Sequence, residues 1–79
     1  MLNDIKIRGA MMLGLLINND EQKEIEYLVK RELEEILFDL GDHRIDELAK
    51  QSMRERYKVL YQLLCRFGNQ QDCLRYMLK

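Results

Sequence analysis

The sequence predicts an all-α fold, a small helical bundle of three long helices or segments plus a short C-terminal helix. Apolar residues recur at the i, i+3, i+4 spacing of a helix face over most of the chain. The chain has no proline, and Gly41 and Gly68 each follow the end of such a periodic segment. No segment shows the alternation typical of a strand. With 79 residues, the chain is expected to form one domain, residues 1–79.

The first helix is expected to begin at Asn3 or Asp4, either of which can cap it, and to end near Ile17. From Ala10 onward this helix is apolar nearly all round, so it must be covered on several sides. A domain this small hides only about 60% of its unfolded surface and is marginal alone. We therefore expect a homodimer whose interface contains Met12, Leu13, Leu15, Leu16 and Ile17.

The second helix is expected over about residues 20–40. Asp20 and Glu21 stand at its start, where the helix dipole favours negative charge. The apolar residues from Ile25 to Leu40 follow the helical spacing closely. Gly41 is a suitable residue for ending this helix.

The third helix is expected over about residues 43–67, with Asp42 as its N-cap. An apolar stripe that begins at Ile45 and includes Leu48 runs along it, and Gly68 ends it. Because only one glycine separates the second and third helices, the connection favours an antiparallel helical hairpin or a sharp corner, and we predict the hairpin.

A short fourth helix is expected after Gly68. Asn69 can cap it, and Asp72 stands three residues later as part of a capping box. Its apolar side consists of Cys73, Leu74, Met77 and Leu78. A helix this short is not stable alone, so it must dock against the others.

Cys65 and Cys73 are eight residues apart, which fits neither a zinc site nor a redox motif. We interpret them as two small buried hydrophobic residues in a reducing compartment. The apolar run from Ala10 to Ile17 lacks the cleavage site of a secretory signal and is too short to span a bilayer. The expected location is therefore cytoplasmic, with no membrane contact.

The sequence offers little for catalysis. It has no glycine-rich phosphate loop, and its only serine has no base at a suitable spacing. His43, Asp46 and Glu47 would share a helix face and could hold a divalent metal, although one imidazole makes a poor ligand set. We therefore predict no catalytic residues, no metal and no cofactor.

These observations favour a small non-enzymatic interaction protein, an adaptor or regulator that binds a protein partner through a helix face and also self-associates. The net charge of −1 gives no overall attraction to nucleic acid. The alternative is a nucleic-acid-binding module, because basic and aromatic residues alternate in the third helix as in proteins that bind single strands. The residues that would make this contact are Arg54, Arg56, Lys58 and Tyr61.

Overall fold

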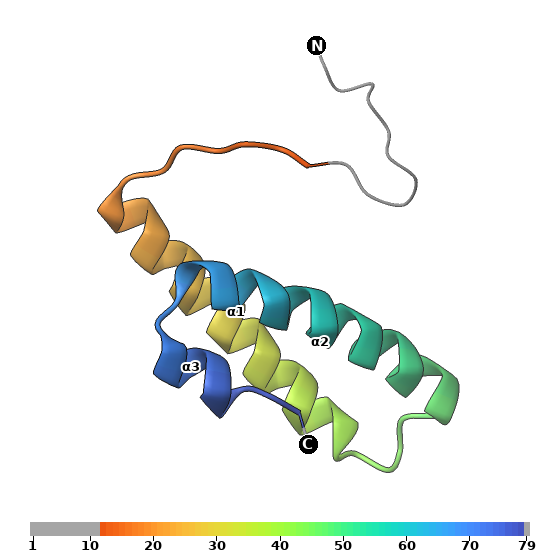
Figure 1. Ribbon diagram of the computed structural model, residues 1–79. Coiled ribbons are helices and arrows are strands. Elements are labelled where there is room, and N and C mark those ends of the chain that lie inside the picture. The colour runs from red at the N-terminus through yellow and green to blue at the C-terminus, as the bar shows by residue number, and fades with distance from the viewer. Residues whose placement is uncertain (1–11, 79) are drawn as a thin grey trace.

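The computed structural model describes residues 12–78, which form two long helices and a short third (Figure 1). The helices are α1 (Asn19–Leu40), α2 (Glu47–Phe67) and α3 (Gln70–Arg75). Residues 12–78 contain no strand, so the all-α prediction is confirmed for this part of the chain. None of these helices is long and apolar enough to cross a membrane.

A first helix ending near Ile17 is not found, because residues 12–18 are not helical. The predicted caps Asn3 and Asp4 lie outside the described residues. Asn18 has an extended backbone, with φ −93° and ψ 178°, because it caps α1 instead. Its side-chain oxygen accepts from the Glu21 N–H at 2.8 Å, and the Glu21 carboxylate accepts from the Asn18 N–H at 3.0 Å. This reciprocal capping box fixes where α1 begins.

The second long helix begins four residues later than predicted. Asp46, not Asp42, is the N-cap of α2, and its carboxylate accepts from the Ala49 N–H at 2.8 Å. Asp42 instead accepts hydrogen bonds from the backbone and the guanidinium of Arg44 within the connecting segment. These bonds lower the pKa of the Asp42 carboxyl. Aspartate is a favoured N-cap residue at either position. The Asp42 carboxylate is bonded to Arg44, and Asp46 is the one that caps α2.

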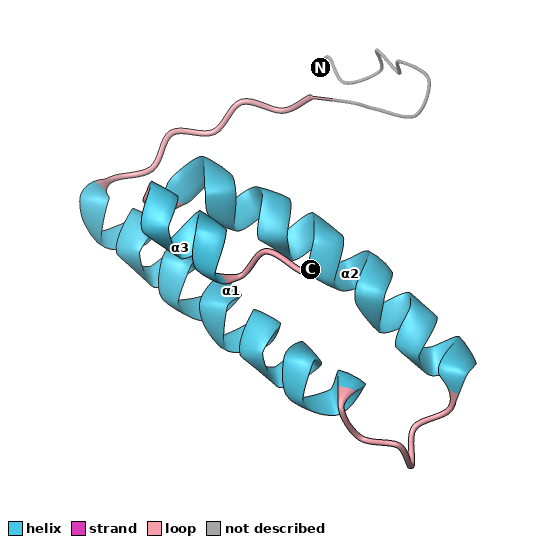
Figure 2. Ribbon diagram, turned by 60° about the horizontal axis from the view of Figure 1, so that its bottom comes forward, coloured by secondary structure: helices cyan, strands magenta, loops and turns pink. Residues whose placement is uncertain are grey.

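The two long helices pack side by side (Figure 2). The Gln22 side chain, near the start of α1, donates a hydrogen bond to the backbone carbonyl of Phe67 at the end of α2, at 2.8 Å. Near the middle of both helices, Glu32 pairs with Arg56 at 3.1 Å. These contacts place the beginning of α1 against the end of α2.

The core lies along the seam between α1 and α2 and under α3. Its buried residues are Val29, Leu33 and Ile36 of α1, Tyr57 and Leu64 of α2, and Tyr76 directly after α3. Each α1 residue belongs to the predicted apolar stripe, because positions 29, 33 and 36 follow helical spacing.

The short helix α3 forms where it was expected. The Asn69 side chain caps it by accepting from the Asp72 N–H at 2.8 Å. The turn at Gly68 and Asn69 brings α3 back against α2. This return places the last part of the chain over one side of the α1–α2 seam.

Candidate interaction surfaces

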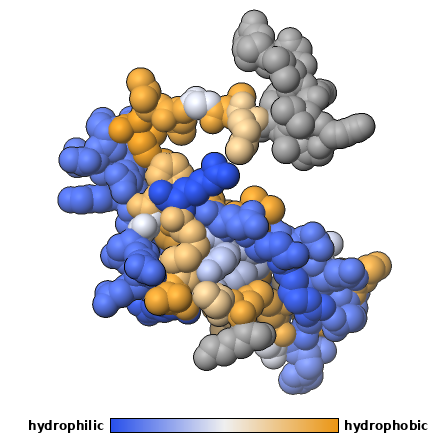
Figure 3. All heavy atoms as spheres, in the orientation of Figure 1, coloured by the Kyte–Doolittle hydropathy of each residue, from blue (hydrophilic) through white to orange (hydrophobic). Residues whose placement is uncertain are grey.

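The most exposed apolar surface is the segment that precedes α1, residues 12–17, which we call the apolar arm. Met12, Leu13, Leu15 and Leu16 are 77%, 75%, 73% and 98% exposed, whereas Ile17 is half-buried. Figures 1 and 2 show the arm leading away from the helices, and Figure 3 shows it as a hydrophobic projection. The five predicted interface residues therefore lie together on an extended segment, whereas the sequence placed them on a helix.

Large apolar side chains are also exposed on the helices. Phe38 on α1 is 79% exposed, and Leu48 at the start of α2 is 77% exposed. The sequence placed Leu48 within the apolar stripe of the helix. Leu48 does lie in α2, but it is nine residues and therefore about 180° around the helix from the buried Tyr57, so it faces outward. The exposure of Phe38 was not predicted. Its position outside the apolar stripe of residues 20–40 was a signal in the sequence that it would face the solvent. Exposed apolar side chains in this number are typical of a surface that binds another protein.

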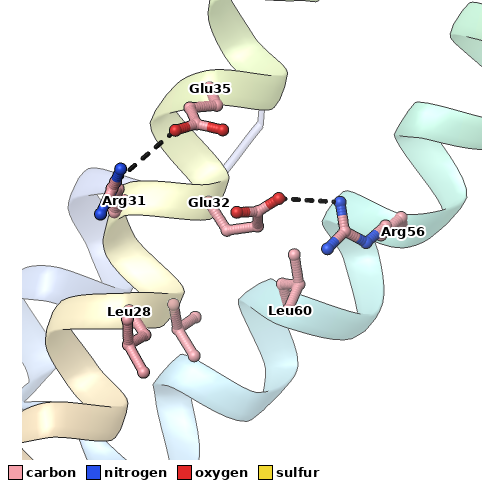
Figure 4. A pocket seen from close by; sticks show the side chains of 7 residues that line it. Leu28, Arg31, Glu32, Glu35, Arg56 and Leu60 are labelled. Atoms are coloured by element: carbon pink, nitrogen blue, oxygen red, sulfur yellow. Dashed lines mark hydrogen bonds and ion pairs between the residues drawn. The ribbon is translucent and has the colours of Figure 1, made fainter.

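A shallow groove of about 410 Å³ lies between α1 and α2, and we call it the seam groove. It is lined by Leu28, Val29, Arg31, Glu32, Glu35, Arg56 and Leu60 (Figure 4). The Glu32 carboxylate points to Arg56 across the groove, and Arg31 pairs with Glu35 at 3.6 Å. Its charged side chains are thus paired with one another, and Leu28, Val29 and Leu60 supply its apolar surface.

The seam groove and α3 lie on opposite sides of the α1–α2 seam. Lys30 of α1 pairs with Asp72 of α3 at 2.7 Å, and Glu34 contacts Tyr76. Helical geometry turns Lys30 and Glu34 away from the face that carries Leu28 and Glu32. One side of the seam is therefore covered by α3, and the other is the open groove.

The predicted nucleic-acid residues do not form one cluster. Arg54, Lys58 and Tyr61 line a pocket of about 360 Å³ on the α3 side of α2. Arg56 points to the other side, where it pairs with Glu32 in the seam groove. Arg54 is itself paired with Glu47. The sequence brought the four residues together because they are close in number, but Arg56 is two residues from both Arg54 and Lys58, and this spacing places it on another face of the helix.

The two cysteines form a disulfide, with 5.0 Å between their Cα atoms, so the interpretation of Cys65 and Cys73 as separate buried thiols is wrong. Cys65 lies near the end of α2 and Cys73 in α3. Spacing alone gave no sign of the bond, because it depends on the turn that folds α3 back on α2. Both cysteines are partly exposed.

Two tyrosines form a buried polar connection beneath α3. The Tyr57 hydroxyl donates to the backbone carbonyl of Tyr76 at 2.6 Å, and the Tyr76 hydroxyl donates to the Glu34 carboxylate at 2.5 Å. Burial, and after it the hydrogen bond to Glu34, raises the pKa of Tyr76 to about 12. The Tyr76 hydroxyl is therefore held as a neutral donor at physiological pH.

His43 lies in the exposed segment between α1 and α2, outside any helix. The helix face that His43, Asp46 and Glu47 were expected to share is absent, because Asp46 is the cap of α2. Within residues 12–78, no group of three His, Cys, Asp or Glu residues is placed to hold a metal ion.

Comparison of the chain with protein-family models, with characterised proteins and with solved structures found no match. The function is therefore inferred from the exposed surfaces of the protein itself.

Proposed function

We propose that this protein is a small interaction module that binds through apolar side chains, and that its first partner is a second copy of itself. The observation that carries the proposal is the apolar arm. Four large side chains within five residues, interrupted only by Gly14, are each at least 73% exposed. Leaving this surface in water is unfavourable by about 25 cal/mol for each Å². Association with another apolar surface removes that cost.

The seam groove is the surface that best fits the arm of a second copy. Its apolar residues Leu28, Val29 and Leu60 lie between α1 and α2. The arm carries no charged residue, and the charges around the groove are already paired with one another. Six extended residues span about 20 Å, and the stretch of α1 from Leu28 to Glu35 rises about 10 Å. The arm is thus long enough to lie along the groove.

Exchange of arms between two copies gives a closed, two-fold dimer. In such an interface each copy supplies one arm and one groove, so both arms and both grooves are occupied and neither stays exposed to water. This symmetry favours a dimer over an open chain of subunits. The protein would act as an adaptor or regulator in the same way, because another protein with a comparable apolar segment would bind in the seam groove.

The expected non-enzymatic character and cytoplasmic location remain predictions. The disulfide removes one argument for a reducing compartment, because stable disulfides are typical of oxidising ones. Disulfides that do form in a reducing cytoplasm are usually transient and redox-sensing. A cytoplasmic location therefore requires that this bond be reducible.

Nucleic-acid binding remains the alternative, with less support. Both arginines of the predicted contact are paired with glutamates, Arg54 with Glu47 and Arg56 with Glu32. Arg54, Lys58 and Tyr61 remain together on one face and supply the combination of cations and an aromatic ring that single strands require.

Solution mass tests the proposal. Light scattering from micromolar to sub-micromolar concentration is expected to give twice 9.6 kDa at the higher concentrations. The double variant Leu13→Glu/Leu16→Glu should be a monomer with unchanged helix content by circular dichroism, because both side chains lie outside the helices. Leu48→Glu is the matched control, since Leu48 is as exposed as Leu13 but lies outside the arm and the groove.

Two results would contradict the proposal. A wild-type monomer at about 100 µM would mean that association is too weak to be the function, since it implies binding weaker than about −5 kcal/mol. A dimer that survives both arm substitutions would place the interface elsewhere. The variant Leu28→Glu then tests the groove separately, since it changes a half-exposed residue of the proposed docking surface.

A further inference from the structure

We propose that the Cys65–Cys73 disulfide is a redox-sensitive clasp: it holds α3 over one side of the α1–α2 seam, and reduction releases α3 while α1 and α2 stay folded. The bond joins the last turns of α2 to α3 across the turn at Gly68 and Asn69. This inference concerns the side of the molecule opposite the seam groove and does not depend on self-association.

The first observation is that α3 has little independent stability. It is six residues long, and a helix of this length does not persist unless it docks. None of its own residues is buried, and the buried residue of this region is Tyr76, which follows it. The attachment of α3 therefore depends on a small number of contacts, of which the disulfide is the covalent one.

The other contacts are non-covalent, and they consist of polar bonds and the burial of Tyr76. Lys30 pairs with Asp72 at 2.7 Å, with both side chains partly exposed. Tyr76 is held through its carbonyl by Tyr57 and through its hydroxyl by Glu34. Partly exposed ion pairs and single hydrogen bonds each contribute modestly to stability. A disulfide that closes a short loop contributes more, because it restricts the unfolded chain.

The second observation is that most of the buried cluster belongs to α1 and α2 themselves. Its members there are Val29, Leu33, Ile36, Tyr57 and Leu64, and Tyr76 is the one buried member from the end of the chain. Polar contacts between them lie at the helix ends and in the seam groove, at Gln22–Phe67 and Glu32–Arg56. Loss of α3 therefore leaves the principal packing of α1 on α2 in place.

The third observation is that a reductant can reach the bond, because both cysteines are partly exposed. A thiolate of an external dithiol attacks one sulfur, which forms a mixed disulfide and frees the other cysteine. The second thiol of the reductant then displaces the first cysteine, so two electrons and two protons convert the disulfide to two thiols and leave the reductant as a disulfide. The Tyr61 hydroxyl of α2 lies 3.5 Å from the Cys73 sulfur of α3, and this contact is lost when α3 leaves α2.

Release of α3 changes the surface of α2. Tyr57 and Tyr61 line the pocket that Met77 and Leu78, which follow Tyr76, close on its other side. Departure of this segment exposes both tyrosines beside Arg54 and Lys58, which are already exposed. The reduced protein thus adds two aromatic rings to a basic face, where the oxidised protein covers the rings.

Hydrogen exchange on the oxidised and reduced full-length protein tests the clasp. Alkylation and mass measurement first establish that the air-oxidised protein has no free thiol and the dithiothreitol-treated protein two. On reduction, amides of residues 70–76 should exchange at least about tenfold faster. Amides of Val29, Leu33 and Leu64 should change by less than about twofold. The variant Cys65→Ser/Cys73→Ser should behave as the reduced protein without any reductant.

Each other outcome overturns the proposal. Two free thiols in the air-oxidised protein would mean that the bond does not form. Unchanged exchange at residues 70–76 after reduction would mean that α3 stays docked without it. Faster exchange throughout α1 and α2 would make the disulfide a general support of the fold rather than a clasp. Reoxidation must also restore the slow exchange of residues 70–76, because a switch is reversible.

Discussion

The hydroxyl of Tyr57 donates a hydrogen bond to the backbone carbonyl of Tyr76 across a separation of 19 residues, at 2.6 Å. Both residues are almost completely buried. The Tyr76 hydroxyl in turn reaches Glu34, so this pair connects α2, the end of α3 and α1. An unpaired carbonyl at this position would cost free energy, because water does not reach it.

The substitution Tyr57→Phe should therefore lower the free energy of unfolding by about 1–2 kcal/mol, because it leaves the Tyr76 carbonyl without its donor. For a domain of this size that corresponds to a lower Tm by roughly 5–10 °C. Thermal unfolding followed by circular dichroism measures the shift. Tyr27→Phe is the matched control, since Tyr27 is 58% exposed and its substitution should leave Tm almost unchanged. Equal effects of the two substitutions would show that the buried bond contributes nothing.

Stability should fall steeply at alkaline pH because of Tyr76. Its pKa in the folded protein is raised to about 12 by burial and by Glu34, whereas an unfolded tyrosine titrates near about 10. The contribution is complete below about pH 10, where both states hold the proton. As pH rises from about 10 to 12, the unfolded state loses the proton first, so the folded state loses up to about 2 kcal/mol of relative stability.

Urea unfolding at pH 9 and at pH 11 checks this prediction in the wild type and in Tyr76→Phe. The substitution removes the titrating hydroxyl, so stability should depend less on pH in the variant. The difference between the two proteins isolates Tyr76 from lysines, which titrate in the same range. Parallel pH dependence of the two proteins would disprove the assignment.

The two glycines that end the long helices should respond differently to alanine. A Cβ at Gly68 would lie 3.0 Å from the Leu64 carbonyl oxygen and 3.1 Å from the Leu64 Cδ1 atom, and Leu64 is fully buried. Gly68→Ala should cost about 1 kcal/mol through this crowding. A Cβ at Gly41 meets ordinary contacts, and its φ of −84° suits any residue. Gly41→Ala should therefore be neutral or add about 0.5 kcal/mol.

Chemical denaturation of the two alanine variants under the same conditions decides the comparison. A Gly68→Ala protein as stable as the wild type would mean that the chain around Leu64 relaxes at no cost. A destabilised Gly41→Ala protein would mean that the segment after α1 needs a glycine for a reason other than its backbone angles.

Local signals in the sequence predicted the helices well where the capping side chain had no competing partner nearby. The apolar stripe of α1 and the Asn69 cap of α3 are both found in the structure. The start of α2 was misplaced because Asp42 was predicted as its cap, whereas in the structure Asp42 is bonded to Arg44 and Asp46 caps the helix. Competition of this kind is not visible in a propensity pattern.

The surfaces were harder to predict, because they depend on contacts between distant residues. Residues 12–17 were predicted to form part of a helix that other elements cover, whereas in the structure they are not helical and most of their side chains are exposed. The disulfide depends on the turn at Gly68, and only this turn brings Cys65 close to Cys73. Sequence spacing alone therefore does not predict how these residues are arranged in space.

The division of the basic residues between two faces of α2 gives a specific test of the nucleic-acid alternative. Arg54 and Lys58 share one face, and Arg56 is on the other in its pair with Glu32. If this face contacts phosphates, Arg54→Ala/Lys58→Ala should weaken binding of a labelled single strand and reduce its salt dependence by about one unit for each lost contact. Arg56→Ala, the matched control, should leave binding unchanged. No retention of single strands by the wild type at low salt, or equal losses in both variants, would leave protein–protein association as the function that the surfaces of this molecule support.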